Sequence, residues 1–364
     1  MMRISKRTSL LLVGSALHLG ATSVTQAATD CNVVTEISPT ECKSLLELYH
    51  STDGAHWKNN EEWNITNTPC SWKGITCEND GVTRIDLSTN QLTGTIPNFS
   101  ALPNLEKLSL YSNQLTGAIP NFSALPNLKE LSLNSNQLIG TIPDFSALPN
   151  LEWLRLYSNQ LTSTIPDFSA LPNLVWLSLH SNQLTGTIPD FSALPNLRGL
   201  VLKSNQLTGM IPNFSALPNL RGLSLDSNQL TGTIPNFSAL SNLEKLSLYS
   251  NQLTGTIPNF SAALSSLREL SLDSNQLTGT IPNFSALYSL RELSLDSNQL
   301  MGMIPVSSNR LINLKYLDIR NNPLCKKADV DYSIWPIEQS RSNDKTTWQA
   351  QLETFPICEA PTDK

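Results

Sequence analysis

Leucines alternate with polar residues in a short pattern that returns throughout the middle of the chain. In one copy, Leu105 is followed by Leu108 and Leu110, and these last two flank Ser109. This alternation has the period of a β-strand with one buried face. One strand of this length cannot bury that face alone. The pattern therefore predicts copies stacked side by side as a parallel sheet over one continuous core.

The copies recur at an almost constant interval, which an asparagine marks. The interval is 23 residues through the first eight copies and then 24, 23 and 24, and the first longer step comes from one extra alanine at Ala262-Ala263. The series gives eleven units between about Val82 and Leu324 and predicts a repeat solenoid. The marker residues are Asn90, Asn113, Asn136, Asn159, Asn182, Asn205, Asn228, Asn251, Asn275, Asn298 and Asn322.

Residues after each strand predict how the chain turns and returns. The amide of Asn113 is expected to bond backbone groups of its own turn and the next, so that the copies form a ladder. Gly117 permits a turn, and Pro120, which lacks an N–H, suits a return segment outside a full ladder. Nine of the ten phenylalanines recur on this return segment, where a buried stack is expected rather than a ligand surface. They are Phe99, Phe122, Phe145, Phe168, Phe191, Phe214, Phe237, Phe260 and Phe284.

The units follow LxxLxLxxNxLTGxIP, as in Leu220 to Pro235. This pattern resembles the plant-type subclass of the leucine-rich repeat family, and exported bacterial proteins with an IPxFSAL segment are also similar. The resemblance implies an α/β repeat solenoid, a curved right-handed coil with its parallel sheet on the concave face, capped at both ends. It also implies a short second sheet beside LTGxIP. Most units here are one residue shorter than the usual plant-type unit, which leaves the curvature and twist open.

The first 27 residues have the features of an export signal. Arg3, Lys6 and Arg7 precede a short apolar run, and small residues place a cleavage site after Ala27. A buried N-terminal helix is the alternative. Removal of residues 1–27 would change the formal net charge from −6 to −9. We therefore expect an acidic protein that is secreted or held at the cell surface, with a periplasmic location also open.

Residues 28–81 and 325–364 are predicted to be the caps of a repeat region over 82–324, because exposed end layers need covers. Ser38-Pro39-Thr40-Glu41 has capping-box spacing with proline at the first helical position, which predicts a helix from about Pro39 to His50. The stretch from Cys70 to Cys77 resembles the plant-type N-terminal cap. The tryptophans expected to pack inside the two caps are Trp57, Trp63 and Trp72 in the first, and Trp335 and Trp348 in the second.

The six cysteines suit an oxidising compartment. They fall into three groups, two before the repeats and one after them. Spacing alone leaves the connectivity open, but the grouping favours local pairs. No CxxC motif occurs, which argues against a zinc site and against a thioredoxin-type redox site. The favoured pairs are Cys31–Cys42, Cys70–Cys77 and Cys325–Cys358.

Composition and motifs argue against several functional classes. The isoelectric point near 5.3 disfavours a nucleic-acid binder, and no later stretch reaches the ~20 apolar residues of a membrane span. Only His50, His56 and His180 follow the export signal, and HExxH, GxSxG and phosphate-loop motifs are absent. We therefore expect a non-enzymatic monomer with no catalytic residue, metal or cofactor.

Three neighbouring units break the uniformity of the predicted concave face. The strand positions that should face it hold Trp153 and Trp176 in adjacent units, and strands lie ~4.8 Å apart, so the two rings should be neighbours. Exposed Trp, Tyr and Arg anchor protein interfaces. Trp faces also stack on sugars, so a protein or a polysaccharide partner is expected, and random variation on a solvated surface is the alternative. The predicted binding residues are Trp153, Arg155, Tyr157, Trp176, His180, Val201 and Lys203.

An acidic row occupies matching positions in later units, at Glu269 and Asp273 and at Glu292 and Asp296, with Asp226 further up. Carboxylates in such a row can keep a surface hydrated and soluble, contact a basic partner or bind calcium. The sequence leaves these three interpretations open.

The sequence thus predicts an exported recognition protein that binds through the concave face of its repeats, with a bacterial adhesin or host-facing surface protein as the preferred form. The uniformity of the units also suits a structural spacer of the cell envelope. The resemblance implies two further forms, an inhibitor of a foreign cell-wall enzyme and a receptor-kinase ectodomain. The latter is disfavoured because no membrane span or kinase region follows Leu324.

Overall fold

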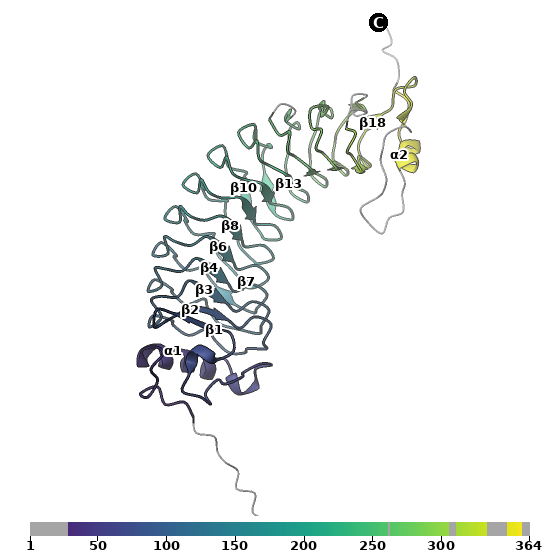
Figure 1. The fold of residues 1–364 in the computed structure, drawn as a ribbon. Helices are drawn as coiled ribbons and strands as arrows, with labels where there is room; N and C mark the ends of the chain where they lie inside the picture. Colours follow the sequence, from purple (N-terminus) through teal and green to yellow (C-terminus); the bar gives the residue numbers. More distant parts are fainter. Residues whose placement is uncertain (1–27, 261–262, 306–310, 333–347, 359–364) are drawn as a thin grey trace, which may run out of the picture.

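The protein is a curved solenoid, seen in a computed structural model that describes residues 28–260, 263–305, 311–332 and 348–358 (Figure 1). The predicted export signal, residues 1–27, and Trp335 lie outside the described residues. The repeats form successive coils whose strands line the concave side, and a cap lies at each end (Figure 1). Among the described residues the helices lie in the caps, so the return segments of the coils are irregular.

Within the described residues the main sheet has twelve strands, and they follow one another in chain order. The strands of the second sheet lie between them in sequence but do not join the main sheet. β1 (Ile75–Glu78) pairs antiparallel with β2 (Gly81–Asp86), and all later neighbours are parallel. Each strand from β3 onward buries its central leucine and pairs in step with the same position of the next unit. The remaining strands are β3 (Lys107–Ser109), β4 (Glu130–Ser132), β6 (Trp153–Arg155), β8 (Trp176–Ser178), β9 (Gly199–Val201), β11 (Gly222–Ser224), β13 (Lys245–Ser247), β14 (Glu269–Ser271), β15 (Glu292–Ser294) and β17 (Tyr316–Asp318).

The short second sheet implied by the resemblance is present as three two-stranded pieces joined by single parallel bridges. One bridge joins Thr95 to Thr116. The backbone hydrogen bonds of this second sheet run from one coil to the next beside the main sheet. Neighbouring coils are therefore hydrogen-bonded through two sheets. The pieces are β5 (Ile139–Gly140) with β7 (Gln160–Leu161), β10 (Thr208–Met210) with β12 (Gln229–Thr231), and β16 (Gly302–Met303) with β18 (Leu324–Cys325).

The phenylalanines form the buried stack that their period predicts. All nine are at most 3% exposed. The ring centroids of Phe99 and Phe122 lie 6.3 Å apart with nearly parallel planes, and Phe237 and Phe260 repeat this distance. Together with the strand leucines they make one core that continues from coil to coil. The aromatic column is therefore a packing element.

The asparagine ladder is present, but its direction differs from the prediction. Asn113 Nδ2 donates to the carbonyls of Leu110 and Leu87, both at 2.9 Å, and its Oδ1 accepts from Leu92 N at 3.0 Å. The amide thus joins its own turn to the preceding one, and the expectation of a bond to the next turn was wrong. The strand ends at this point, so these backbone groups would otherwise lack a partner.

A second asparagine ladder on the return segments was not predicted. Asn127 Nδ2 donates to Pro103 O at 3.1 Å, and Asn150 donates in the same way to Pro126 O at 3.0 Å. The Leu-Pro-Asn-Leu segment that holds these residues repeats in the sequence. That repetition was the available signal.

The N-terminal cap begins with α1 (Pro39–Ser51), which ends one residue beyond the predicted helix. The predicted capping box is present, because Ser38 Oγ accepts from Glu41 N at 3.2 Å and Glu41 Oε2 accepts from Ser38 N at 3.1 Å. Glu41 Oε1 also accepts from Val82 N at 3.1 Å, which joins the helix to the second strand. Two short 3₁₀ turns follow, η1 (Gly54–His56) and η2 (Pro69–Ser71).

The cap tryptophans are buried, as predicted for packing residues. Trp63 lies between Trp57 and Trp72, with ring centroids 5.0 and 4.8 Å away. At the other end, α2 (Trp348–Thr354) places Trp348 in the core, where its Nε1 donates to Tyr332 O at 2.8 Å. The disulfides are those that the grouping favoured: Cys31–Cys42, Cys70–Cys77 and Cys325–Cys358.

Candidate functional site

The candidate site lies where three strands of the main sheet place aromatic side chains on the concave face. β6, β8 and β9 pair in register, so Trp153 stands beside Trp176 and Trp176 beside Gly199. The side chains of a strand alternate between core and surface, so their leucines point into the core while these residues face outward. In most other units the outward residue between the two strand leucines, which is Arg155 in β6, is a serine.

The two tryptophans form a stacked, half-buried pair. Their ring centroids are 6.1 Å apart and their planes differ by 17°. A Cβ on Gly199 would lie 2.4 Å from the Trp176 ring, so this indole lies across the backbone of the next strand. Around Gly222, one strand further on, a Cβ would meet nothing within 4 Å. The aromatic pair therefore borders an open shelf.

Arg155 is held over the Trp153 ring, with its guanidinium carbon 4.8 Å from the centroid. Its Nη1 donates to Glu130 Oε1 at 2.6 Å and to Ser132 Oγ at 3.1 Å. Lys107 Nζ lies 2.9 Å from the other Glu130 oxygen. Burial acts to raise the pKa of Glu130, but the hydrogen bonds and charges of Lys107 and Arg155 outweigh it and lower that pKa. The charges here are thus paired beside the rings, which remain the accessible feature.

Tyr157 and His180 form a second stacked pair, with ring centroids 4.2 Å apart. His180 Nδ1 lies 2.9 Å from Ser178 Oγ. Burial, followed by the positive charge of Lys203, lowers the pKa of His180 to about 4. The imidazole is therefore neutral at pH 7 and adds an uncharged ring to the site.

These side chains line an open hollow of about 410 Å³. It brings together six of the seven predicted binding residues and adds Ser178, whose role in holding His180 no sequence pattern signalled. Lys203 does not line the hollow, although its charge acts on His180. The lining residues are Trp153, Arg155, Tyr157, Trp176, Ser178, His180 and Val201.

The acidic row continues along the same face toward the C-terminus. Burial and the carboxylates of Asp296 and Asp318 raise the pKa of Asp273 to about 6. Glu269 instead pairs with Lys245, whose Nζ lies 2.5 Å from it. Within the described residues no group of three or more His, Cys, Asp or Glu could hold a metal ion. The calcium hypothesis therefore has no coordinating group behind it in that part of the chain.

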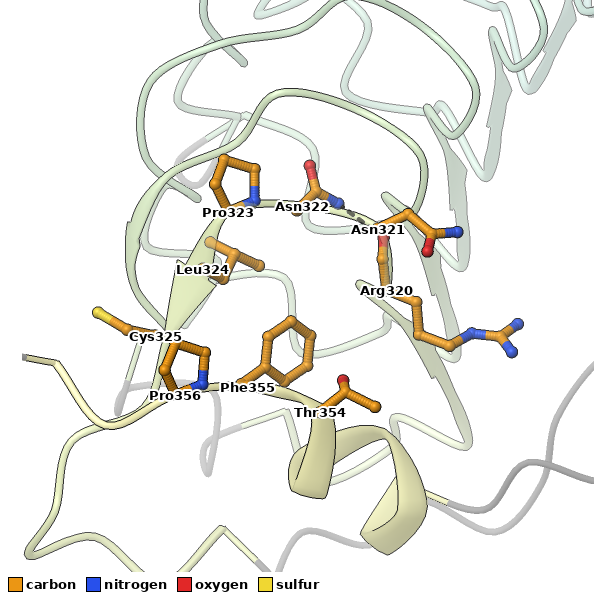
Figure 2. A pocket seen from close by; sticks show the side chains of 9 residues that line it. All are labelled: Arg320, Asn321, Asn322, Pro323, Leu324, Cys325, Thr354, Phe355 and Pro356. Carbon is orange, nitrogen blue, oxygen red and sulfur yellow. Dashed lines mark hydrogen bonds between the residues drawn. The ribbon is translucent and has the colours of Figure 1, made fainter.

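A second hollow, of about 500 Å³, lies between the last coil and the C-terminal cap (Figure 2). Figure 2 shows Leu324 and Phe355 facing each other there, from β18 and from the end of α2. Its polar residues are engaged elsewhere, since the Arg320 guanidinium lies 2.6 Å from Asp318 and the Asn322 amide belongs to the ladder. This hollow lies at the junction between the last coil and the C-terminal cap.

Family models identify the repeats and the first cap. Three models described as leucine-rich repeats together match residues 103–147, 150–171, 172–286 and 289–311. A model described as the leucine-rich repeat N-terminal domain matches residues 38–78, which contain α1 and the three cap tryptophans. Among the described residues, no helix has the length and apolarity to cross a bilayer.

Known relatives include receptors and an ice-binding protein. A probable leucine-rich repeat receptor-like protein kinase of Arabidopsis thaliana is 37% identical over 72 residues, which are 20% of this chain and 10% of the kinase. The Arabidopsis receptor kinase HAESA, solved with the peptide hormone IDA and the co-receptor SERK1, is 32% identical with a TM-score of 0.65, over 79% of this chain and 54% of that one. A plant ice-binding protein is 30% identical with a TM-score of 0.69, over 80% and 96%.

The chain thus spans about half of the HAESA chain and a tenth of the receptor-like kinase. It spans nearly all of the ice-binding protein. The in-register parallel strands, the LTGxIP turns on a second sheet and the disulfide-bonded first cap agree with the family matches. The chain belongs to the leucine-rich repeat family, in its plant-type subclass.

Proposed function

We propose that this protein is an extracellular recognition module that binds an extended segment of a partner protein along its concave face. The observation that carries the proposal is the pair of aromatic stacks, Trp153 with Trp176 and Tyr157 with His180, in one hollow. Aromatic rings that are held rigid and half-exposed anchor interfaces because they bury a large apolar area at little entropic cost.

The shape of the site favours a segment that lies across the strands. The hollow is open and continues onto the shelf at Gly222, so a chain seated there can pass from coil to coil. Beyond the shelf the face becomes acidic, at Asp273 and Asp296. The partner segment is therefore expected to place an apolar or aromatic side chain on the tryptophans and a basic one further along. HAESA, which has the same fold, binds a peptide hormone.

The test is a selection of displayed random peptides on the disulfide-bonded protein, followed by measured affinities for Trp153→Ala/Trp176→Ala. Loss of a hot-spot tryptophan weakens binding by ~2 kcal/mol or more, about 30-fold. Tyr111→Ala is the matched control, because Tyr111 is an exposed aromatic residue two units before the hollow. Both variants should unfold at temperatures close to that of the wild type.

The outcomes separate the competing functions. Peptides that bind the wild type and the Tyr111 variant but not the double variant support the proposal. Equal binding by all three proteins contradicts it. Binding only to soluble polysaccharides, lost in the double variant, would assign the hollow to a glycan. If no ligand binds and the double variant has the same stability as the wild type, a structural spacer of the envelope replaces recognition as the proposed function.

A further inference from the structure

The second sheet carries a surface that peptide recognition does not use. We call it the threonine face. It consists of the two residues that flank the turn glycine in each of ten successive units; in one of these units the turn residue is Ser163 instead of glycine. Fifteen of these twenty positions are threonine and none is charged. Almost all of these side chains are exposed. The threonines are Thr93, Thr95, Thr116, Thr141, Thr162, Thr164, Thr185, Thr187, Thr208, Thr231, Thr233, Thr254, Thr256, Thr278 and Thr280.

The backbone sets these threonines in a regular register. The second threonine of one unit stands beside the first of the next, as in the bridges Thr164–Thr185 and Thr187–Thr208. In each bridge the backbone N–H of the threonine in the later unit donates to the carbonyl of the turn residue in the earlier unit. Thr208 N, for example, donates to Gly186 O at 2.8 Å. Neighbouring coils are therefore spaced as strands in a sheet, ~4.8 Å apart.

The threonines that follow the turn position share one orientation as well. A Cβ added to Gly186 would lie 2.7 Å from Thr164 Cγ2, and a Cβ added to any of five other turn glycines would lie 2.8 to 3.2 Å from the threonine methyl of the preceding unit. Each of these methyls fills the space above the next glycine. A β-branched side chain is stiff about χ1. Little conformational entropy would be lost when a ligand binds such an array.

The uniformity of the face restricts its ligand. An irregular protein segment is selected by contacts that differ along the surface, as on the concave face, whereas nine of the ten units here present at least one threonine methyl and hydroxyl at these positions. A ligand that gains from such an array must itself repeat at the strand spacing. It must also be uncharged and offer both hydrogen-bond partners and apolar hollows. The surface of ice has these properties, with a repeat close to that between strands.

We propose that the threonine face binds ice. The hydroxyls take the places of water molecules at the ice surface, and the methyls sit in the hollows between them. Met210, which interrupts the face, lies with its Cγ 2.9 Å from where a Cβ on Gly232 would be. A long unbranched side chain is thus accommodated there, so a lysine can be introduced without disturbing the fold.

The experiment measures thermal hysteresis and the incorporation of labelled protein into a growing ice hemisphere. Thr164→Lys/Thr187→Lys puts two charges on the face, and we expect it to abolish both signals. Ala170→Lys/Ala193→Lys is the matched control, because these exposed alanines lie on the return segments that follow the two threonines. This control and Trp153→Ala/Trp176→Ala should both behave as the wild type.

Two results would overturn the proposal. One is wild-type protein that ice excludes as it excludes albumin. The other is a lysine variant that enters ice as well as the wild type does. Binding to crystalline cellulose or chitin without incorporation into ice, lost only in the threonine variant, would replace ice with a crystalline polysaccharide. None of these results depends on the concave face, so the test is independent of peptide recognition.

Discussion

At the scale of single residues, the candidate site depends on one position without a side chain. Gly199 is buried under the Trp176 ring, which lies where a Cβ would stand. Gly222 occupies the matching position one strand later and faces open space. The two glycines are thus equivalent in sequence pattern but different in surroundings, which makes them a matched pair.

Gly199→Ala should displace the Trp176 indole, because the new Cβ would lie 2.4 Å from the ring. We expect a changed near-ultraviolet circular dichroism spectrum and weaker binding at the hollow. Gly222→Ala should change neither. If the two variants have the same spectrum and affinity, Trp176 is not seated across Gly199.

Asp273 gives a pH-dependent prediction. Its pKa of about 6 is raised from the usual 3.8, so the folded state binds a proton more tightly than the unfolded state. Stability contributed by this group is therefore lost as pH rises from about 3.8 to about 6. Asp273→Asn should raise the unfolding temperature at pH 7.5 and have little effect at pH 4.

Thermal unfolding of both proteins across this pH range measures the effect. Asp144→Asn is the control, since Asp144 lies on an exposed return segment where other units carry asparagine. An Asp273 variant that gains as much stability at pH 4 as at pH 7.5 would show that ionisation of this buried carboxyl is not the cause.

At the scale of the repeating element, the two asparagine ladders differ in burial. Asn159 is 9% exposed, and its amide donates to Leu133 O and Leu156 O and accepts from Leu138 N. Asn150, on the return segment, is exposed and makes one such bond, to Pro126 O. The inner ladder alone satisfies buried backbone groups, so we expect it to dominate the stability of each unit.

Asn159→Ala should lower the free energy of unfolding by about 3 kcal/mol, because it leaves several buried backbone groups unsatisfied at ~1–3 kcal/mol each. Asn150→Ala removes one exposed bond and should lower it by about 1 kcal/mol or less. Urea denaturation of the two variants provides the comparison. Equal losses would mean that burial does not distinguish the ladders.

At the scale of the whole molecule, each coil contacts its neighbours through bonds that reach about one unit along the chain. The strands pair at offsets of 23 or 24 residues, as in Lys245 with Glu269, where the extra alanine is absorbed without loss of register. A solenoid of this kind has a stability that is roughly the sum of its units and their interfaces. Its length is therefore separable from its fold.

Deletion of residues 229–251, one complete unit, should leave a folded protein with a slightly lower unfolding temperature and an unchanged aromatic hollow. Deletion of residues 229–240, about half a unit, should unfold the region around it because strands and leucines lose register. Circular dichroism and peptide affinity compare the two. A protein that tolerated both deletions equally would not have the nearest-neighbour architecture described above.

The sequence predicted the fold in detail because the period of its leucines and asparagines allows only one register. It also placed Trp153 beside Trp176, since residues one period apart must be neighbours. What it could not predict depends on side-chain direction. The asparagine amide turns back to the preceding coil, Trp176 leans over Gly199, and Ser178 holds His180. A period fixes where a residue stands, but its rotamer is chosen by neighbours in space.

The carboxylate of Glu41 has a consequence for the order in which the chain folds. One of its oxygens completes the cap of α1, and the other accepts from Val82 at the start of the repeats. The helix and the second strand are therefore stabilised together, on the N-terminal side of the later coils, and they are synthesised before those coils. Every later coil finds its partner one unit behind it, so folding can advance in one direction, coil by coil, while the remainder of the chain is still emerging.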